Sequence, residues 1–313
     1  MKLFQSIVLI FISLNFYAQV QNLIPRTIFT KKEPKLIDFN YKKEADLNRG
    51  DLFFEKDSTS LTYRPRSSGW SFGLDYRKTQ ISNGEIALED GSILGDSLEG
   101  LQLNIGKTFK AKDQSDWALS VSFGSDSDDL FRRSSDNTIQ VGIVNIRPGD
   151  KNRWVFGAFY NSNFIAGNFP LPVIAYYYKP SKNFEVLVGL PFLSLLWGNF
   201  FKDSLFILAT PGNARIIAAK SIYGPAAFFV GAETISENFQ DFNRVDRDER
   251  LFIQRTNIFL GIRSPLSRKT LLSLTYGIRT DSEVFQAEGR FDDAESFELE
   301  NSNYVSLDFT LRY

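Results

Sequence analysis

The side chains that could perform chemistry in this chain are limited to carboxylates, lysines, arginines, tyrosines and hydroxyls. Its 313 residues contain no cysteine and no histidine, and the single methionine is Met1. The chain therefore cannot build a disulfide, an iron–sulfur ligand set or a cysteine-type zinc site. It also lacks the general base of Ser-His-Asp and Cys-His catalytic sets. We expect no enzyme, no cofactor and no metal site, although the remaining residues could still support a carboxylate-based site.

Charged residues of both signs recur in the middle of otherwise alternating segments. They are Asp75, Arg77, Arg255, Arg279, Asp308 and Arg312. One interpretation is a charged constriction in a lumen that selects or orients a solute. The other is a ladder of opposite charges that pairs across strands and fills a narrow interior. Asp75 and Asp308 are predicted to lie on the first and last strands, which become neighbours if the sheet closes.

The elements that must position these charges alternate with a period of two residues. Apolar and polar side chains alternate through Trp70–Arg77, Trp117–Gly124, Leu272–Arg279 and Val305–Tyr313. This pattern predicts strands whose two faces meet different surroundings. No segment carries a convincing helical stripe, so the fold class is all-β.

The connections between these segments fall into two classes by length. Short polar turns are expected at Ala111–Ser115, Pro148–Asn152, Pro180–Asn183 and Pro265–Lys269. They alternate with longer polar stretches at Ser82–Asp96, Ser125–Asn137, Ser236–Arg250 and Asp281–Asn303. Short turns at one end and long loops at the other are typical of outer-membrane barrels, as are aromatic residues near strand ends. A soluble secreted β-sandwich remains the structural alternative, because alternation alone does not identify the lipid-facing side.

The domain organisation follows from where the alternation begins. Residues 1–18 combine Lys2 with an apolar run that ends at Ala18, which predicts a signal peptide. Residues 19–66 show no sustained period and are interpreted as an N-terminal extension, either a periplasmic tail or a plug. Residues 67–313 are predicted to form a single antiparallel up-and-down transmembrane β-barrel. The 244 residues from Trp70 to Tyr313 (313 − 70 + 1) suggest about 12 strands, with 10 or 14 as alternatives.

The last ten residues, Tyr304–Tyr313, resemble the C-terminal strand signal of bacterial outer-membrane proteins. Leu307, Phe309 and Leu311 alternate with polar residues, and Tyr313 is aromatic. The resemblance implies that the barrel-assembly machinery reads these four residues during insertion.

A second resemblance lies in the middle of the chain. Pro172–Ser181 ends in a Tyr-x-x-Pro-Ser pattern, and the following segment, Phe184–Pro191, ends in Gly-Leu-Pro. The pair is similar to a segment found in a family of bacterial outer-membrane β-barrels of unknown function. The resemblance implies the fold but brings no activity.

The function predicted from these observations is a non-enzymatic β-barrel in the cell outer membrane, either a narrow channel for small solutes or a structural barrel. Its expected partners are outer-membrane lipid, the barrel-assembly machinery and, for a channel, a small solute. The 36 Lys and Arg against 37 Asp and Glu show no basic excess, so no nucleic-acid partner is expected. Two alternatives remain. One is an adhesion or interaction barrel that uses long acidic loops such as Glu288–Glu300, and the other is a soluble β-sandwich binding protein.

Overall fold

The computed structural model describes 17 antiparallel strands and one short 3₁₀ helix. It covers residues 37–47, 53–65, 68–82, 95–147, 149, 152–162, 170–190, 192–199, 203–210, 213–239, 250–267, 269–287 and 296–312. The strands are β1 (Ile37–Asp46), β2 (Phe53–Tyr63), β3 (Trp70–Ser82), β4 (Ser97–Lys110), β5 (Asp116–Ser127), β6 (Asn137–Arg147), β7 (Asn152–Asn161), β8 (Leu171–Ser181), β9 (Phe184–Leu190), β10 (Leu193–Gly198), β11 (Ser204–Thr210), β12 (Asn213–Tyr223), β13 (Ala226–Phe239), β14 (Arg250–Pro265), β15 (Thr270–Ala287), β16 (Ser296–Leu299) and β17 (Ser302–Arg312); the 3₁₀ helix is η1 (Ser134–Asp136). No helix in these ranges is long and apolar enough to cross a membrane.

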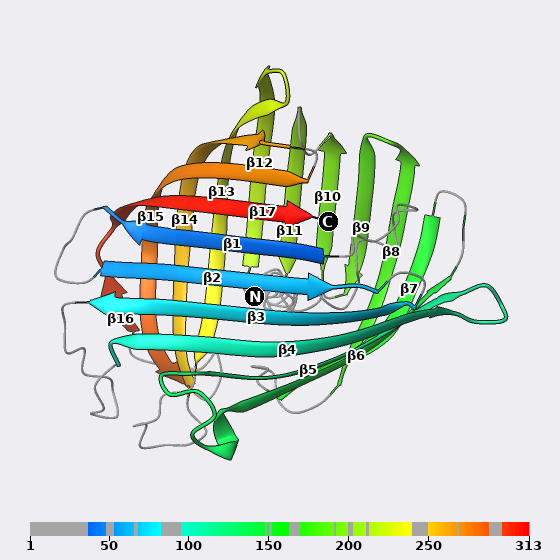
Figure 1. Cartoon of the computed structure of the whole chain (residues 1–313), viewed down its shortest axis with the longest axis horizontal. Coiled ribbons are helices and arrows are strands. Elements are labelled where there is room, and N and C mark those ends of the chain that lie inside the picture. The colour runs from blue at the N-terminus through cyan, green and yellow to red at the C-terminus, as the bar shows by residue number, and fades with distance from the viewer. Residues whose placement is uncertain are drawn as a thin grey trace, which may run out of the picture.

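The sheet closes on itself (Figure 1). Each strand from β1 to β15 pairs with the next one, and β17 pairs with both β15 and β1. The short strand β16 pairs with the loop-side part of β15 and lies outside the ring. The barrel therefore has 16 strands, and the expectation of about 12, with 10 or 14 as alternatives, was wrong. A closed ring also rules out the β-sandwich alternative.

The miscount arose in two parts of the chain. Strands β1 and β2 lie within residues 19–66, the segment interpreted as an N-terminal extension, yet they pair with β17 and β3 as part of the wall. Their outward positions include Lys43 and Asp57, which hide the apolar alternation. The second part is Gly189–Tyr223, where three strands are packed more densely than about 20 residues per strand allows. The predicted signal peptide, residues 1–18, lies outside the described residues.

The two ends of the barrel differ in their connections. We call the end with residues 64–69, 111–115, 148–151, 182–183, 199–203, 224–225 and 266–269 the turn end. The opposite end, with the connections 47–52, 83–96, 128–136, 162–170, 191–192, 211–212, 240–249 and 288–301, is the loop end. The four predicted short turns fall at the turn end and the four predicted long stretches at the loop end, which also has the two-residue connections 191–192 and 211–212. By the rule for bacterial barrels, the turn end is periplasmic and the loop end is extracellular.

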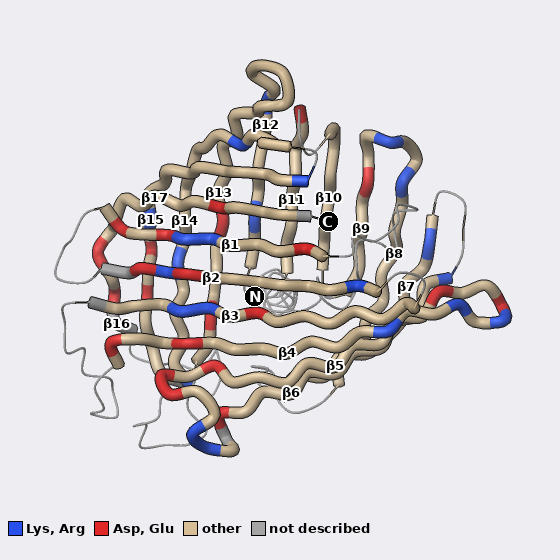
Figure 2. Tube along the Cα trace, in the orientation of Figure 1, with Lys and Arg blue, Asp and Glu red and all other residues tan. Residues whose placement is uncertain are grey.

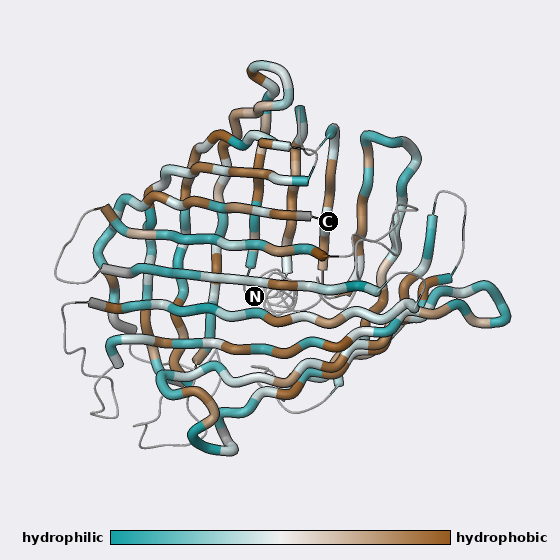
Figure 3. The backbone as a smooth tube through the Cα atoms, viewed as in Figure 1, coloured by the Kyte–Doolittle hydropathy of each residue, from teal (hydrophilic) through white to brown (hydrophobic). Residues whose placement is uncertain are grey.

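The outer surface is largely apolar, and alternation along most strands separates it from the interior (Figure 3). On β14, for example, Ile258, Leu260 and Ile262 point outward and are about half exposed, whereas Phe259 and Arg263 point inward and are buried. The four tryptophans, Trp70, Trp117, Trp154 and Trp197, all lie at the turn end of their strands. A closed barrel with an apolar outer band and an aromatic girdle satisfies its backbone hydrogen bonds within lipid. The protein is an outer-membrane β-barrel.

Candidate functional site: an ion network across the lumen

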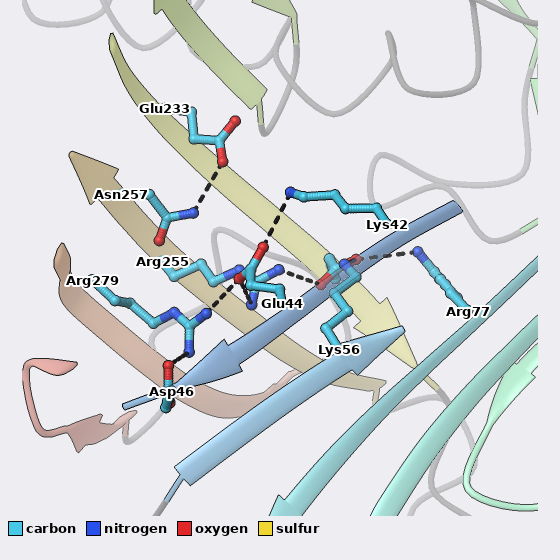
Figure 4. A network of polar contacts seen from close by, with 10 residues as sticks. Lys42, Glu44, Asp46, Lys56, Arg77, Glu233, Arg255, Asn257 and Arg279 are labelled. Atoms are coloured by element: carbon cyan, nitrogen blue, oxygen red, sulfur yellow. Dashed lines mark hydrogen bonds and ion pairs between the residues drawn. The ribbon is translucent and has the colours of Figure 1, made fainter. Parts of the chain in front are cut away.

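The interior of the barrel holds a network of buried charges near the loop end. Its side chains come from the inner faces of two separate arcs of the wall, β1–β5 and β13–β15 (Figure 4). In Figure 2, the charged residues of β1, β2 and β3 gather toward the loop ends of these strands, at the left of the picture. The network contains Lys42, Glu44, Asp46, Lys56, Arg77, Asp126, Glu233, Glu237, Arg255, Asn257 and Arg279.

Arg279 on β15 anchors one part of this network. Its Nη2 donates to Glu44 Oε1 at 2.5 Å, and its Nη1 donates to Asp46 Oδ1 at 2.7 Å. Both acceptors are on β1, so the contact passes over β17, where Tyr304 lies with its ring centroid 5.4 Å from the guanidinium. Tyr304 is able to lie there because its strand partner is Gly277, where a Cβ would come within 2.5 Å of the ring.

Glu237 on β13 is the centre of the second part. Its carboxylate accepts from Lys56 Nζ on β2, lies 3.5 Å from Arg77 Nη1 on β3, and lies 3.4 Å from Arg255 Nη2 on β14. Arg77 is also paired with Asp126 on β5, at 2.9 Å. Along the wall, β2 and β13 are separated by β1, β17, β15 and β14. The ion pairs of Glu237 with β2 and β3 therefore cross the lumen.

The backbone confirms that the ring is flattened at this level. Strands β5 and β13 stand eight steps apart in a ring of 16, which makes them diametrically opposite, yet their Cα atoms come within 8 Å. Toward the loop end, Ile81 and Leu98 pack in one buried cluster with Phe239 and Leu251 from the other arc. The Arg77 guanidinium lies 4.8 Å from the Phe239 ring centroid and joins the ionic and apolar layers. We call this closed region the pinch.

The pinch defines the shape of the interior more than it adds stability. Taking several charges out of water costs much of what their mutual attraction returns, so a buried ion network is weak evidence for net stabilisation. Removing one partner, by contrast, leaves an uncompensated buried charge and is strongly destabilising. The network therefore specifies which two arcs meet across the lumen.

The structure brings together three of the six predicted lumen charges, Arg77, Arg255 and Arg279. Asp75 lies nearer the turn end, where Asn104 Nδ2 donates to it at 2.5 Å. The expectation that Asp75 and Asp308 lie on neighbouring strands was wrong, because β1 and β2 stand between β3 and β17. Asp308 accepts from Thr310 Oγ1 at 3.4 Å, and Arg312 pairs in register with Asp38, its side chain lying outside the described part.

Sequence reasoning missed the anionic half of the network. Glu44 and Asp46 were not considered because residues 19–66 were interpreted as an extension. The available signal was the two-residue spacing of Lys42, Glu44 and Asp46, which places three charges on one face of a strand.

The residues of the predicted assembly signal lie on the outer face of β17. Leu307 is exposed, and the Phe309 ring contacts Phe39 on β1 with centroids 6.5 Å apart, which ties the closing pair of strands together. Leu311 pairs in register with Phe39. Tyr313 is outside the described residues. Their role in assembly stays a prediction.

The inner faces of β5–β10 differ from the pinch in chemistry. Side chains of β5–β9, with Phe192 just before β10, form one buried apolar cluster made of Ala118, Val144, Ile146, Val155, Phe159, Val173, Ala175, Tyr177, Leu187 and Phe192. Near this cluster, at the turn end, Lys179 Nζ on β8 forms an ion pair with Glu185 Oε2 on β9 at 2.6 Å. Nowhere in the described ranges do three or more acidic residues gather in a way that could hold a metal ion.

The chain matches no family model and no curated protein. Among solved structures it is similar to the CymD monoaromatic hydrocarbon channel, at 12% identity and a TM-score of 0.38, over 94% of this chain and 92% of that one. It is also similar to the outer membrane protein Omp33 of Acinetobacter baumannii, at 8% identity and a TM-score of 0.36, over 89% and 98% of the two chains. The KdgM porin matches at 8% identity and a TM-score of 0.30, over 88% and 99%. At such low identities and TM-scores, none of these three likenesses indicates what this chain transports.

Proposed function

We propose that the protein is a narrow, non-enzymatic channel for small solutes in the outer membrane. The observation that carries this proposal is a ring of 16 strands whose interior is closed where β1–β5 meet β13–β15. A 16-stranded ring is in the size class that encloses an aqueous channel. Because β1–β5 and β13–β15 meet across the lumen, we expect a solute path to run along β6–β12 and to be narrower than a round barrel of this size would provide.

The charges of the pinch largely neutralise one another. Its cations and those bound to it are Lys42, Lys56, Arg77, Arg215, Arg255 and Arg279, six in all, against the five anions Glu44, Asp46, Asp126, Glu233 and Glu237. A field that is balanced in this way gives weak preference for either sign of ion. We therefore expect a channel of low conductance and low ion selectivity.

Single-channel recording of the full chain in planar bilayers tests this proposal. The expected result is small, discrete conductance steps that change little when the salt gradient is reversed. Insertion is verified independently by heat-modifiable migration of the reconstituted sample on a detergent gel. A barrel that inserts fully and conducts no ions would overturn the channel proposal.

A further inference from the structure

The wall of the barrel is unusually low at β9, β10 and β11. These strands have seven, six and seven residues, whereas β8 and β12 on either side have 11 each. At ~3.3 Å per residue, a strand of this length extends about 23 Å. At a tilt of about 45° it covers roughly 16 Å along the membrane normal, less than the ~25 Å apolar band of outer-membrane barrels. We call these three strands the low wall.

Part of the missing height is at the loop end. At the turn end, Trp197 places β10 in the aromatic girdle, while β12 continues past Ala219, the partner of Ser204 at the start of β11, to Tyr223. At the other end, reciprocal backbone hydrogen bonds between Gly189 and Phe192, at 2.9 and 3.0 Å, close a tight hairpin. The next hairpin closes at Thr210, whose Oγ1 donates to the Asn213 carbonyl at 2.9 Å.

The neighbouring strands continue past these hairpins. The pairing of β8 with β9 ends at Ile174 and Leu190, but β8 extends to Leu171, which pairs with β7 instead. On the other side, the pairing of β12 with β13 ends at Asn213 and Ile235, while β13 continues to Phe239. The described wall therefore steps down between β8 and β13.

Beyond Glu185 at the turn end of β9, the low wall is largely apolar on both faces. The sequence from Val186 to Phe201 contains no charged residue. Val188, Leu190 and Leu193 are exposed on the outside, and the inward side chains Leu187, Phe192, Phe206 and Leu208 are buried. A strand between lipid and an aqueous lumen would alternate apolar with polar residues. Two apolar faces, the inner one buried, fit a wall that has lipid outside and closely packed apolar side chains inside.

The tip of the β9–β10 hairpin has the chemistry of a lipid contact. Leu190, at this tip, is 63% exposed. Turns that project into water are dominated by glycine and polar residues, as at the loop after β5, where Asp129 and Arg132 form an exposed ion pair at 2.8 Å. An exposed leucine at the loop end of β9 fits the hydrocarbon region of the outer leaflet instead.

We propose that the low wall is a lateral port through which uncharged, apolar small molecules pass between the lumen and the outer leaflet. This inference rests on the proposed channel function and deepens it by naming the class of cargo. The pinch blocks the polar arc, and the apolar cluster of β5–β10 continues from the low wall toward the turn end. A molecule that crosses above Leu190 thus meets apolar side chains on both sides of the wall.

The depth of the hairpin tip is the first test. Because the chain contains no cysteine, Leu190→Cys provides a unique attachment point for a fluorophore. We expect this probe to be quenched by lipids that carry spin labels within their acyl chains, and to be shielded from aqueous iodide. The matched control is Arg132→Cys in an exposed loop, which should be quenched by iodide. Equal iodide quenching at both positions would overturn the low wall as a membrane-level opening.

The second test measures transport in bacterial cells whose outer membrane contains lipopolysaccharide. The readout is uptake of 1-N-phenylnaphthylamine, an uncharged aromatic amine whose fluorescence rises in lipid. Modification of Leu190→Cys with a bulky membrane-permeant maleimide should reduce uptake to the level of cells without the protein, while the unmodified variant retains it. Ile139→Cys, also outward near the loop end but on a full-length strand, is the control and should keep its uptake after modification.

The outcomes separate this inference from the proposed function. Uptake that is unchanged by the Leu190 label, or reduced equally by the Ile139 label, overturns the lateral port. It leaves the channel proposal to be decided by ion conductance. If the barrel conducts no ions but dye uptake is blocked by the label at Leu190 and not by the label at Ile139, the solute channel is overturned and the lateral port is retained.

Discussion

Lys56 and Glu237 form an ion pair across the interior of the barrel, although four strands of the wall separate them. Both side chains are largely buried, and Glu237 also lies within 3.5 Å of Arg77 and Arg255. The pair thus connects β2, near the N-terminal end of the barrel sequence, to β13, which lies near its C-terminal end.

The first prediction concerns the stability of this connection. Glu237→Ala leaves Lys56, Arg77 and Arg255 without their common anion, and we expect it to lower the free energy of unfolding by about 3–5 kcal/mol. The double variant Lys56→Met with Glu237→Met removes one charge of each sign at similar volume and should cost much less. Urea denaturation of the protein in detergent micelles measures both. Equal losses for the single and double variants would show that packing, and not charge, holds the pinch.

The second prediction concerns conductance. Truncating the pair by Lys56→Ala with Glu237→Ala opens space across the lumen, so single-channel conductance should rise. The matched control is Lys43→Ala with Asp57→Ala, an ion pair at 3.9 Å on β1 and β2 that faces outward. Its removal should leave conductance unchanged. A rise in the control as large as in the test pair would argue that any loss of charge loosens the wall.

The third prediction is a pH dependence at the turn end. Asp113 accepts hydrogen bonds from the Ser115 N–H at 3.0 Å and from Ser115 Oγ at 2.6 Å, and these lower the pKa of its carboxyl group. A lowered pKa in the folded state means that the stabilisation is present above the unfolded pKa and is lost as the pH falls through the folded one. Asp113→Ala should therefore be less stable than the parent at neutral pH, with the difference disappearing in acid. Lys112→Ala, one residue earlier in the turn, should show no such convergence.

The fourth prediction addresses the assembly signal. Phe309→Ser and Leu311→Ser change outward residues on the strand that closes the ring, and we expect less barrel to reach the outer membrane. Refolding of the same variants from urea into detergent should be impaired much less than their delivery to the outer membrane, because the main loss is in recognition. Leu260→Ser, an equally outward change on β14, is the control. Similar losses for all three variants would assign the effect to lipid contact alone.

The barrel architecture could be predicted from sequence, and the strand number could not. Alternation in Trp70–Arg77 and Val305–Tyr313 identified the wall because these strands separate lipid from the interior cleanly. It failed for β1 and β2, where Lys43 and Asp57 occupy outward positions. It failed again at β9–β11, where residues on both faces are apolar and the period disappears.

The candidate site was predictable in part for a related reason. Arg77, Arg255 and Arg279 stood out as charges within apolar strands. Glu44 lies far in sequence from Arg255 and Arg279, and Glu237 lies far from Arg77. These pairs meet only once the ring has closed. No local pattern encodes a contact between opposite arcs of a barrel.

The placement of all four tryptophans at the turn end has a consequence for how the protein responds to bilayer thickness. Indole side chains prefer the interface between headgroups and hydrocarbon, so they fix the depth of the turn end in the inner leaflet. Any mismatch between the height of the wall and the thickness of the membrane must then be taken up at the loop end. In a thicker bilayer the short strands β9–β11 would lie deeper below the outer headgroups, and lipid itself would have to thin beside them.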